Sequence, residues 1–198
     1  MMNLPNILSL VRILVIPVLM LIFYLPIPHN HLIAVIIFIF ACVTDWLDGY
    51  FARSLKQSTR LGAFLDPVAD KLMVSIALVI TVGEPQFQFV SFHARMVIIP
   101  IAFITIPVAI IVGREILVSA LREWMAEMGK RASVAVSRLG KVKTTTQMIA
   151  LAIMLYCEPT TSGYIIVIGY LFLYIAAILT IWSMLFYLKA AWPEFKSK

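Results

Sequence analysis

Six long apolar segments dominate this chain and limit what it can fold into. They span residues 7–24, 31–52, 61–82, 96–125, 143–157 and 164–188. A helix needs about 20 mostly apolar residues to cross a bilayer, and all but the short fifth segment come close to that length. The chain is 62% hydrophobic and 13% charged, which is outside the range of ordinary soluble domains. We therefore predict a single all-α integral membrane domain over residues 1–198, with six transmembrane helices.

Basic residues occur in alternate connections between the apolar segments. Those after the second and fourth segments are Arg53, Lys56, Arg60, Lys130, Arg131, Arg138 and Lys141. By the positive-inside rule, these connections and both termini are predicted to be cytoplasmic. No basic residue precedes the first segment, so we expect it to be retained and not cleaved as a signal peptide. Residues 3–10 could instead form a short amphipathic helix on the membrane surface before the first span.

The net charge of +6 does not indicate nucleic-acid binding. The lysines and arginines fall at the ends of apolar segments, and no basic helix or aromatic-basic module is present. Positive charge in these places favours contact with anionic lipid head groups. The two cysteines, Cys42 and Cys157, give no disulfide framework and are expected to be small buried apolar side chains.

All four aspartates of the chain lie within one short stretch that closes the second segment and opens the third. They are Asp45, Asp48, Asp66 and Asp70. Spacings of three and four residues place each pair on one helix face. Four carboxylates this close repel each other at neutral pH unless a cation lies between them. The pattern therefore predicts a divalent-metal site within a membrane protein.

The ligand type narrows the choice of metal. Carboxylate oxygens favour Mg²⁺, Mn²⁺ or Ca²⁺ over zinc. The three histidines, His29, His31 and His93, are predicted on the opposite side of the membrane, so they do not complete a zinc site. Two alternatives to a metal site stay open. The aspartates could pair with Arg53, Arg60 and Lys71 to fix helix packing, or they could line a cation-transport pathway.

The spacing of the acidic region resembles the signature of the CDP-alcohol phosphotransferases. The pattern Asp-x-x-Asp-Gly-x-x-Ala-Arg, then Gly after eight residues, then two aspartates, is matched at eight positions. These are Asp45, Asp48, Gly49, Ala52, Arg53, Gly62, Asp66 and Asp70. The resemblance implies an integral membrane enzyme of six helices, usually a homodimer. Small residues at such fixed places would also permit close helix packing, so that role is an alternative for Gly49, Ala52 and Gly62.

Three further segments resemble the bacterial members of this family that use glycerol 3-phosphate. They are residues 4–17, 113–123 and 140–147. The implied reaction joins CDP-diacylglycerol to sn-glycerol 3-phosphate, and it yields phosphatidylglycerophosphate and CMP for phospholipid biosynthesis. The resemblance also implies a location in the bacterial cytoplasmic membrane, with the active site on the cytoplasmic side.

The resemblance assigns roles to the motif residues. Asp45, Asp48 and Asp66 would hold two Mg²⁺ ions, with Mn²⁺ as an alternative, and Asp70 would lie at the edge of the metal shell. Asp70 is also the candidate general base for the acceptor hydroxyl. The residues implied in binding CDP-diacylglycerol are Asp45, Gly49, Ala52, Arg53, Gly62 and Asp66.

A phosphate-monoester acceptor calls for a basic pocket. We predict that Arg114, Lys141 and Lys143 form it, with Arg122 behind them. Their alternative role is to set topology at helix ends. Glu115 precedes Arg122 by seven residues on one helix face, so we predict that it orients that arginine. Asn6 and Arg12 are expected to be capping and anchoring residues.

Other functions remain open from the sequence. A cardiolipin synthase, or another CDP-alcohol phosphotransferase, would share the metal motif but would not need a pocket for a small phosphate monoester. A divalent-cation transporter would carry metal without releasing CMP. A structural subunit would lose no activity when Asp66 or Asp70 is neutralised.

Overall fold

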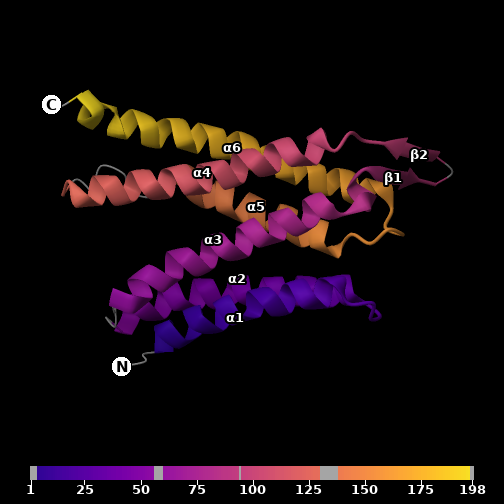
Figure 1. Ribbon diagram of the computed structural model, residues 1–198, viewed down its shortest axis with the longest axis horizontal. Helices are drawn as coiled ribbons and strands as arrows, with labels where there is room; N and C mark the ends of the chain where they lie inside the picture. The colour runs from indigo at the N-terminus through magenta and orange to yellow at the C-terminus, as the bar shows by residue number, and fades with distance from the viewer. Residues whose placement is uncertain (1–3, 56–59, 94, 130–137, 197–198) are drawn as a thin grey trace.

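The chain folds into a long helix bundle with a small hairpin at one end. The computed structural model describes residues 4–55, 60–93, 95–129 and 138–196. Over these residues the helices are α1 (Leu4–Tyr24), α2 (Asn30–Leu55), α3 (Arg60–Gly83), α4 (Ala102–Glu127), α5 (Arg138–Tyr156) and α6 (Gly163–Lys196). Helix α1 begins and helix α6 ends at the same end of the bundle (Figure 1). The chain therefore traverses the long axis an even number of times.

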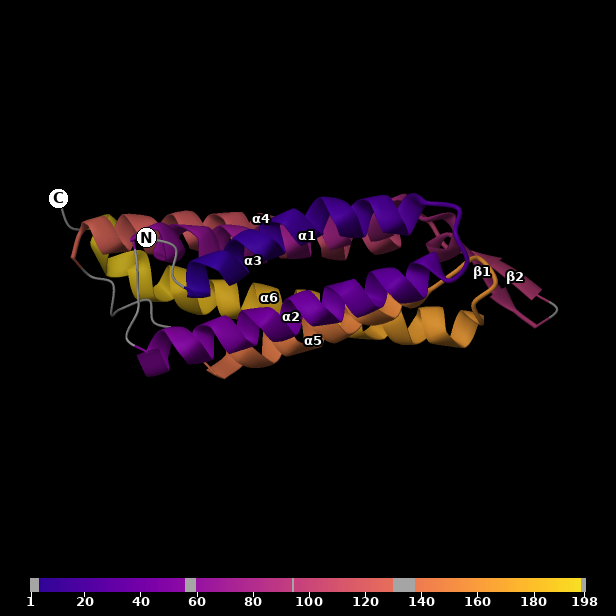
Figure 2. The same ribbon diagram turned by 90° about the horizontal axis from the view of Figure 1, so that it is seen from below.

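Apolar side chains hold the helices together. Helix α1 packs against α2 and α3, while α5 packs against α6 and α2, and α4 packs against α6. Helices α2 and α5 run alongside each other in Figure 2 and are in contact over part of their lengths. Leu78, Ile104, Ile111 and Leu151 are fully buried between these helices. Within a bilayer such contacts stabilise the bundle by van der Waals packing and not by transfer from water. The apolar segments found in the sequence thus also build the core.

The hairpin corrects the all-α prediction. A 3₁₀ turn (Pro85–Phe87) leads into strand β1 (Phe89–Phe92), which pairs antiparallel with β2 (Arg95–Ile98). The predicted helix over 96–125 is therefore wrong at its start, because residues 96–98 are extended and α4 begins at Ala102. The short run Met96-Val97-Ile98 suits a strand as well as a helix, and Pro100 separates it from α4.

The other boundaries differ by a few residues. Helix α1 is continuous from Leu4, so no separate interfacial helix covers residues 4–10. Helix α5 begins at Arg138, five residues before the predicted start. Helix α6 continues through Pro193 to Lys196, beyond the predicted end at 188. The helical class and order are confirmed over the described residues.

Length and composition support membrane insertion for part of the bundle. The helical stretches Ala102–Glu127 and Gly163–Phe195 are long and apolar enough to cross a membrane. Large apolar side chains also point outward on other helices, including Leu14 in α1 and Val79 in α3, which are 68% and 65% exposed. Six membrane spans remain a prediction.

Hydrogen bonds and a close contact fix the hairpin end. The Tyr170 hydroxyl donates to the Phe87 carbonyl at 2.7 Å, and Gln86 Nε2 donates to the Cys157 carbonyl at 2.9 Å. Gly163, which begins α6, lies directly against β1. A Cβ atom at Gly163 would come within 2.6 Å of the Ser91 carbonyl oxygen and 2.8 Å of a Val90 methyl carbon. A side chain at this position therefore requires backbone movement.

We expect Gly163→Ala to lower the free energy of unfolding by about 1–3 kcal/mol, because overpacking against a backbone oxygen cannot be relieved by a side-chain rotation. The measurement is thermal unfolding of the purified protein in detergent. Gly113→Ala is the matched control, since a Cβ atom added there would meet no atom within 4 Å and the helix propensity of alanine favours α4. Equal unfolding midpoints for Gly163→Ala and the unchanged protein would contradict this prediction.

Candidate active site

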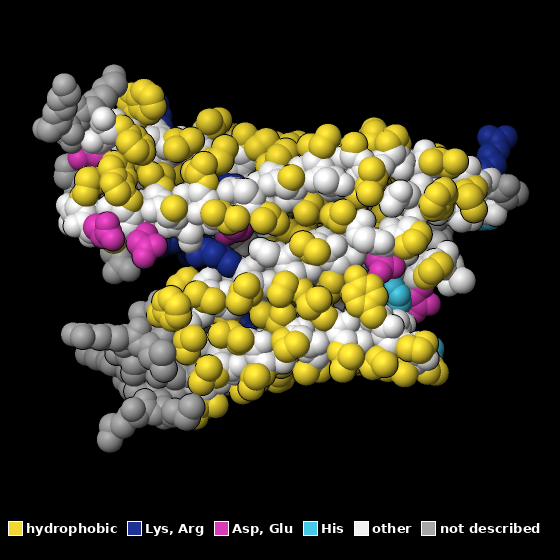
Figure 3. Space-filling model, viewed as in Figure 1, with side chains coloured by type: hydrophobic (Ala, Val, Ile, Leu, Met, Phe, Trp, Pro, Cys, Tyr) yellow, Lys and Arg dark blue, Asp and Glu magenta, His cyan; other side chains and the backbone are white. Residues whose placement is uncertain are grey.

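One polar cavity opens in the half of the bundle where α1 begins and α6 ends. Its volume is about 330 Å³, and helices α2 to α6 all contribute to its wall. Figure 3 shows a mainly apolar surface with charged side chains in a hollow between the α4–α6 layer and the α1–α2 layer. The charged residues that line the cavity are Asp45, Asp70, Lys71, Arg114, Glu115, Arg122 and Lys143. The fold thus collects carboxylates and cations from distant parts of the sequence.

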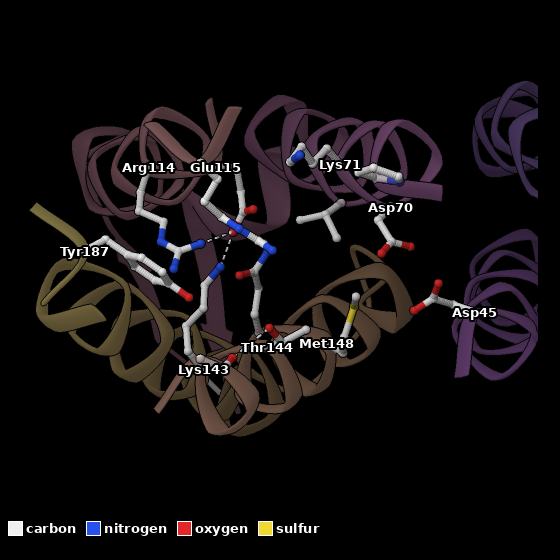
Figure 4. A pocket seen from close by; sticks show the side chains of 14 residues that line it. Asp45, Asp70, Lys71, Arg114, Glu115, Lys143, Thr144, Met148 and Tyr187 are labelled. Atoms are coloured by element: carbon white, nitrogen blue, oxygen red, sulfur yellow. Dashed lines mark hydrogen bonds and ion pairs between the residues drawn. The ribbon is translucent and has the colours of Figure 1, made fainter. Parts of the chain in front are cut away.

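Two carboxylates form one side of the cavity. Asp45 in α2 and Asp70 in α3 point toward each other in Figure 4, and their side chains are 40% and 44% exposed. Asp45 lies ten residues before the end of α2, and Asp70 lies ten residues after the start of α3. Because these helices run in opposite directions, the two positions fall at the same depth. The structure brings these two predicted site residues together.

The remaining motif residues lie on the same two helices. Asp48, Gly49, Ala52 and Arg53 belong to α2, and Asp66 belongs to α3, but their side chains lie outside the described part of the structure. Gly62 is buried in the first turns of α3. Their assigned roles stay predictions.

Arg12 corrects the prediction of an anchoring residue. Its side chain is 0% exposed, and Nη1 donates to Asp45 Oδ1 at 2.6 Å and to Asp70 Oδ1 at 2.8 Å. The position of Arg12 along its helix could have predicted this contact. Arg12 lies eight residues into α1, which at 1.5 Å per residue is close to the depth of both aspartates. A buried arginine at that depth needs an anionic partner, and the two carboxylates supply it.

The carboxylate pair fits a hard divalent cation. Asp45 and Asp70 reach one wall of the cavity from different helices, so they can approach one cation together from the cavity side. Oxygen donors of this kind suit Mg²⁺ or Mn²⁺. Among the described side chains no group of three or more metal-ligating residues is present. Asp48 lies three residues after Asp45 in the sequence, and Asp66 four residues before Asp70.

A buried basic cluster forms the opposite side of the cavity (Figure 4). Lys143 in α5 is 3% exposed and makes a hydrogen-bonded ion pair with Glu115 in α4. Arg114 Nη1 lies 3.3 Å from the same Glu115 oxygen. Arg114 and Lys143 are thereby held side by side, although they come from different helices. The two cations and the one carboxylate leave a net charge of +1 here, which favours an anionic ligand.

Two details of the predicted acceptor pocket change. The sequence predicts that Glu115 orients Arg122, but the described partners of Glu115 are Lys143 and Arg114. Arg122 does line the cavity, whereas Lys141 is exposed and does not. Residues two apart on a helix point in nearly opposite directions, so Lys141 and Lys143 cannot both face the cavity.

Helix α6 supplies residues that the sequence analysis missed. Ser183 Oγ accepts a hydrogen bond from Arg114 Nη2 at 2.7 Å, and the Arg114 guanidinium lies 5.4 Å from the centre of the Tyr187 ring. Thr180, Ser183 and Tyr187 are all buried, at spacings of three and four residues. Their spacing places the three polar residues on one face of an otherwise apolar helix, and this pattern could have predicted that they join the site. These contacts aim Arg114 from a third helix.

Some polar atoms of the site are not satisfied by the protein itself. Arg114 Nε and Gln147 Oε1 are buried and have no hydrogen-bond partner within the described residues. Gln147 also lines the cavity. Because an unmade buried hydrogen bond costs about 1–3 kcal/mol, these two groups point to a ligand that supplies an acceptor and a donor.

An apolar groove adjoins the polar cavity. Its volume is about 390 Å³, and it lies between α2 and α5. The residues that line it are Phe38, Ile39, Cys42, Val43, Thr145, Met148, Ile149 and Ala152. Met148 also lines the polar cavity, so the two spaces are neighbours. A ligand with a charged head and an apolar chain can contact both.

Comparison with known proteins places the chain among relatives of nearly the same length. A protein of Pseudomonas fluorescens named CDP-diacylglycerol–glycerol-3-phosphate 3-phosphatidyltransferase is 49% identical over 197 residues, covering 99% of this chain and 93% of its own. A Pectobacterium atrosepticum protein of the same name is 53% identical, covering 96% and 94%. The Escherichia coli K12 protein of that name is 49% identical, with the same coverage of 96% and 94%.

The family model for CDP-alcohol phosphatidyltransferase matches residues 2–182. The match includes the acidic motif, the basic cluster and the first 20 residues of α6. It confirms the resemblance drawn from the sequence. The chain belongs to the CDP-alcohol phosphatidyltransferase family.

Proposed function

We propose that this protein transfers the phosphatidyl group of CDP-diacylglycerol to sn-glycerol 3-phosphate. The products are phosphatidylglycerophosphate and CMP. One observation carries the proposal: a single cavity has a carboxylate pair on one side and a buried arginine–lysine pair on the other, beside an apolar groove. Relatives about 50% identical over almost the whole chain carry the name of this activity.

Asp70 is the proposed general base. The glycerol hydroxyl oxygen attacks the phosphorus next to diacylglycerol, and the bond from that phosphorus to the CMP oxygen breaks. CMP leaves with the bonding electrons, and the hydroxyl proton passes to the Asp70 carboxylate. The position of Asp70 supports this role, because its partly exposed side chain lines the cavity opposite the basic cluster.

We assign a divalent-cation site for two Mg²⁺ ions, with Mn²⁺ as an alternative, to the aspartate region. Asp45, Asp48 and Asp66 would hold the ions, with Asp70 at the edge of the metal shell. A cation there would neutralise the negative charge of the diphosphate as CMP departs. Gly49, Ala52, Arg53 and Gly62 stay the proposed contacts of the cytidine part, since they follow or precede these aspartates on the same helices.

The basic cluster is the proposed site of the acceptor phosphate. Arg114 offers its unsatisfied Nε to a phosphate oxygen, and Lys143 adds a second charge. Gln147 Oε1 can accept a hydrogen bond from a glycerol hydroxyl. Arg122 adds charge at the wall of the cavity. This arrangement favours a small phosphate monoester over a neutral alcohol.

The apolar groove is the proposed path for a diacylglycerol chain. It runs between α2 and α5 and reaches the cavity at Met148. Exposed apolar side chains on α4 and α6 support insertion in a membrane. We infer a multi-pass protein of the bacterial cytoplasmic membrane, with the cavity and both chain ends on the cytoplasmic side. A homodimer is the assembly that the family resemblance implies.

The test follows label and CMP together. Purified protein in detergent receives CDP-diacylglycerol, Mg²⁺ and labelled glycerol 3-phosphate, and label in lipid is compared with CMP released. Equal amounts of both products support the proposal. CMP release only with phosphatidylglycerol as acceptor would assign cardiolipin synthesis instead, and metal flux into vesicles without CMP would favour a transporter.

Removal of divalent metal is expected to stop the reaction. After chelation with EDTA, the rate of CMP release should fall at least about 100-fold, because the divalent cation is the group assigned to offset charge on the diphosphate as it is cleaved. Adding Mg²⁺ or Mn²⁺ in excess should restore it, whereas adding Na⁺ at equal ionic strength should not. Full activity after exhaustive chelation would reject the metal assignment.

A further inference from the structure

Arg12 occupies an unusual position behind the active site. It is the one charged residue of α1, a helix that is otherwise apolar except for Asn6 and Ser9. Its side chain is completely buried and does not line the cavity. The two carboxylates that it contacts do line the cavity. Arg12 therefore reaches Asp45 and Asp70 from the side remote from substrate.

The geometry couples three helices through one nitrogen. Arg12 Nη1 in α1 bonds Oδ1 of Asp45 in α2 and Oδ1 of Asp70 in α3, at 2.6 and 2.8 Å. A charge-assisted hydrogen bond of this length fixes the rotamer of the carboxylate that accepts it. The carboxylates keep 40% and 44% of their side-chain surface exposed toward the cavity. Each carboxylate is thus held by Arg12 on one side and accessible from the cavity on the other.

We propose that Arg12 is the positioning residue of the acidic site. It sets the orientation of Asp45, a proposed metal ligand, and Asp70, the proposed base, before substrate enters. The inference rests on the proposed metal site. It assigns Arg12 no contact with substrate, because the arginine is separated from the cavity by the carboxylates.

A role in helix packing alone makes a different prediction. An ion pair buried between helices adds little to stability beyond what a well-packed apolar side chain of the same size provides. If Arg12 serves packing alone, Arg12→Met keeps α1 in place and leaves metal binding and turnover unchanged. If Arg12 positions the carboxylates, the same variant must impair metal binding and turnover even when the protein stays folded.

The experiment measures Mn²⁺ affinity by electron paramagnetic resonance and, separately, steady-state kinetics and thermal unfolding in detergent. We expect Arg12→Met to weaken Mn²⁺ binding about 10–100-fold, as loss of a residue that orients metal ligands typically does. The kcat should fall by a similar factor, with the KM for glycerol 3-phosphate changed less than about threefold. Arg12→Lys keeps the charge but not the planar guanidinium, and it should recover part of both losses.

Leu19→Ala is the matched control, because Leu19 is a buried residue of the same helix (2% exposed) and lies seven residues, about 10 Å along the helix axis, beyond Arg12. It should lower the unfolding midpoint yet leave Mn²⁺ affinity within about twofold. If Arg12→Met yields too little folded protein, Arg12→Lys decides the question by the same measurements. Mn²⁺ affinity equal to or tighter than that of the unchanged protein, in either folded Arg12 variant, overturns the inference alone. Failure of the unchanged protein to bind Mn²⁺ overturns the metal proposal and this inference together.

Discussion

Replacing Asp70 by asparagine is expected to lower the kcat of phosphatidyl transfer by about 10²–10⁴-fold, the usual contribution of a positioned acid or base. Asparagine has nearly the shape of aspartate, and its amide oxygen can still accept the hydrogen bond from Arg12. It cannot accept the proton of the attacking hydroxyl. The variant therefore removes the proposed chemistry with little change in shape.

The kinetics separate the two roles of the acidic pair. For Asp70→Asn, saturating Mg²⁺ should not restore kcat, because the missing function is proton acceptance. For Asp45→Asn, raised Mg²⁺ should recover part of the rate, because the missing function is metal affinity. The measurement is CMP release as a function of Mg²⁺ concentration for both variants.

Glu84→Gln is the matched control for neutralising an acid. Glu84 lies between α3 and the 3₁₀ turn, at the hairpin end of the bundle, and it does not line the cavity. The kcat of this variant should stay within about twofold of that of the unchanged protein. A near-normal kcat for folded Asp70→Asn would remove Asp70 from the role of base.

The order of the helices and the meeting of the aspartates follow from simple features of the sequence. Apolar segments of sufficient length define the helices, and alternating direction places the end of α2 beside the start of α3. Asp45 and Asp70 are then close by geometry alone. Depth alone does not bring Arg114 and Lys143 together, because Arg114 lies 13 residues before the end of α4 and Lys143 only five after the start of α5. Their shared partner Glu115 joins them.

Partners across the bundle are harder to predict. The contacts of Arg12 and Glu115 depend on which faces of neighbouring helices pack together. The residue pattern within a single helix does not predict that pairing. Ser183 and Tyr187 look like ordinary polar interruptions of an apolar helix until α6 is placed against α4. The hairpin is too short for its pattern to exclude a helical continuation at residues 96–98.

Arg114 gives the second large effect, which concerns substrate binding. We expect Arg114→Gln to raise the KM for glycerol 3-phosphate by roughly 10–150-fold, because a hydrogen bond to a charged group contributes about 1.5–3 kcal/mol. The kcat should change less, since Arg114 is on the opposite side of the cavity from the acidic pair. Initial rates at varied glycerol 3-phosphate and saturating CDP-diacylglycerol give both constants.

Two variants sharpen the Arg114 result. Arg114→Lys keeps the charge but loses the planar guanidinium that Ser183 and Glu115 orient. Its KM for glycerol 3-phosphate should therefore lie between those of the unchanged protein and Arg114→Gln. Arg95→Gln makes the same chemical change at an exposed position in the hairpin, and its KM should stay within about twofold. A normal KM for folded Arg114→Gln would place the acceptor phosphate elsewhere. A selective loss of glycerol 3-phosphate binding would assign Arg114 to the phosphate of the acceptor. An acceptor without a phosphate monoester does not need the positive charge that contacts from α4, α5 and α6 hold in place.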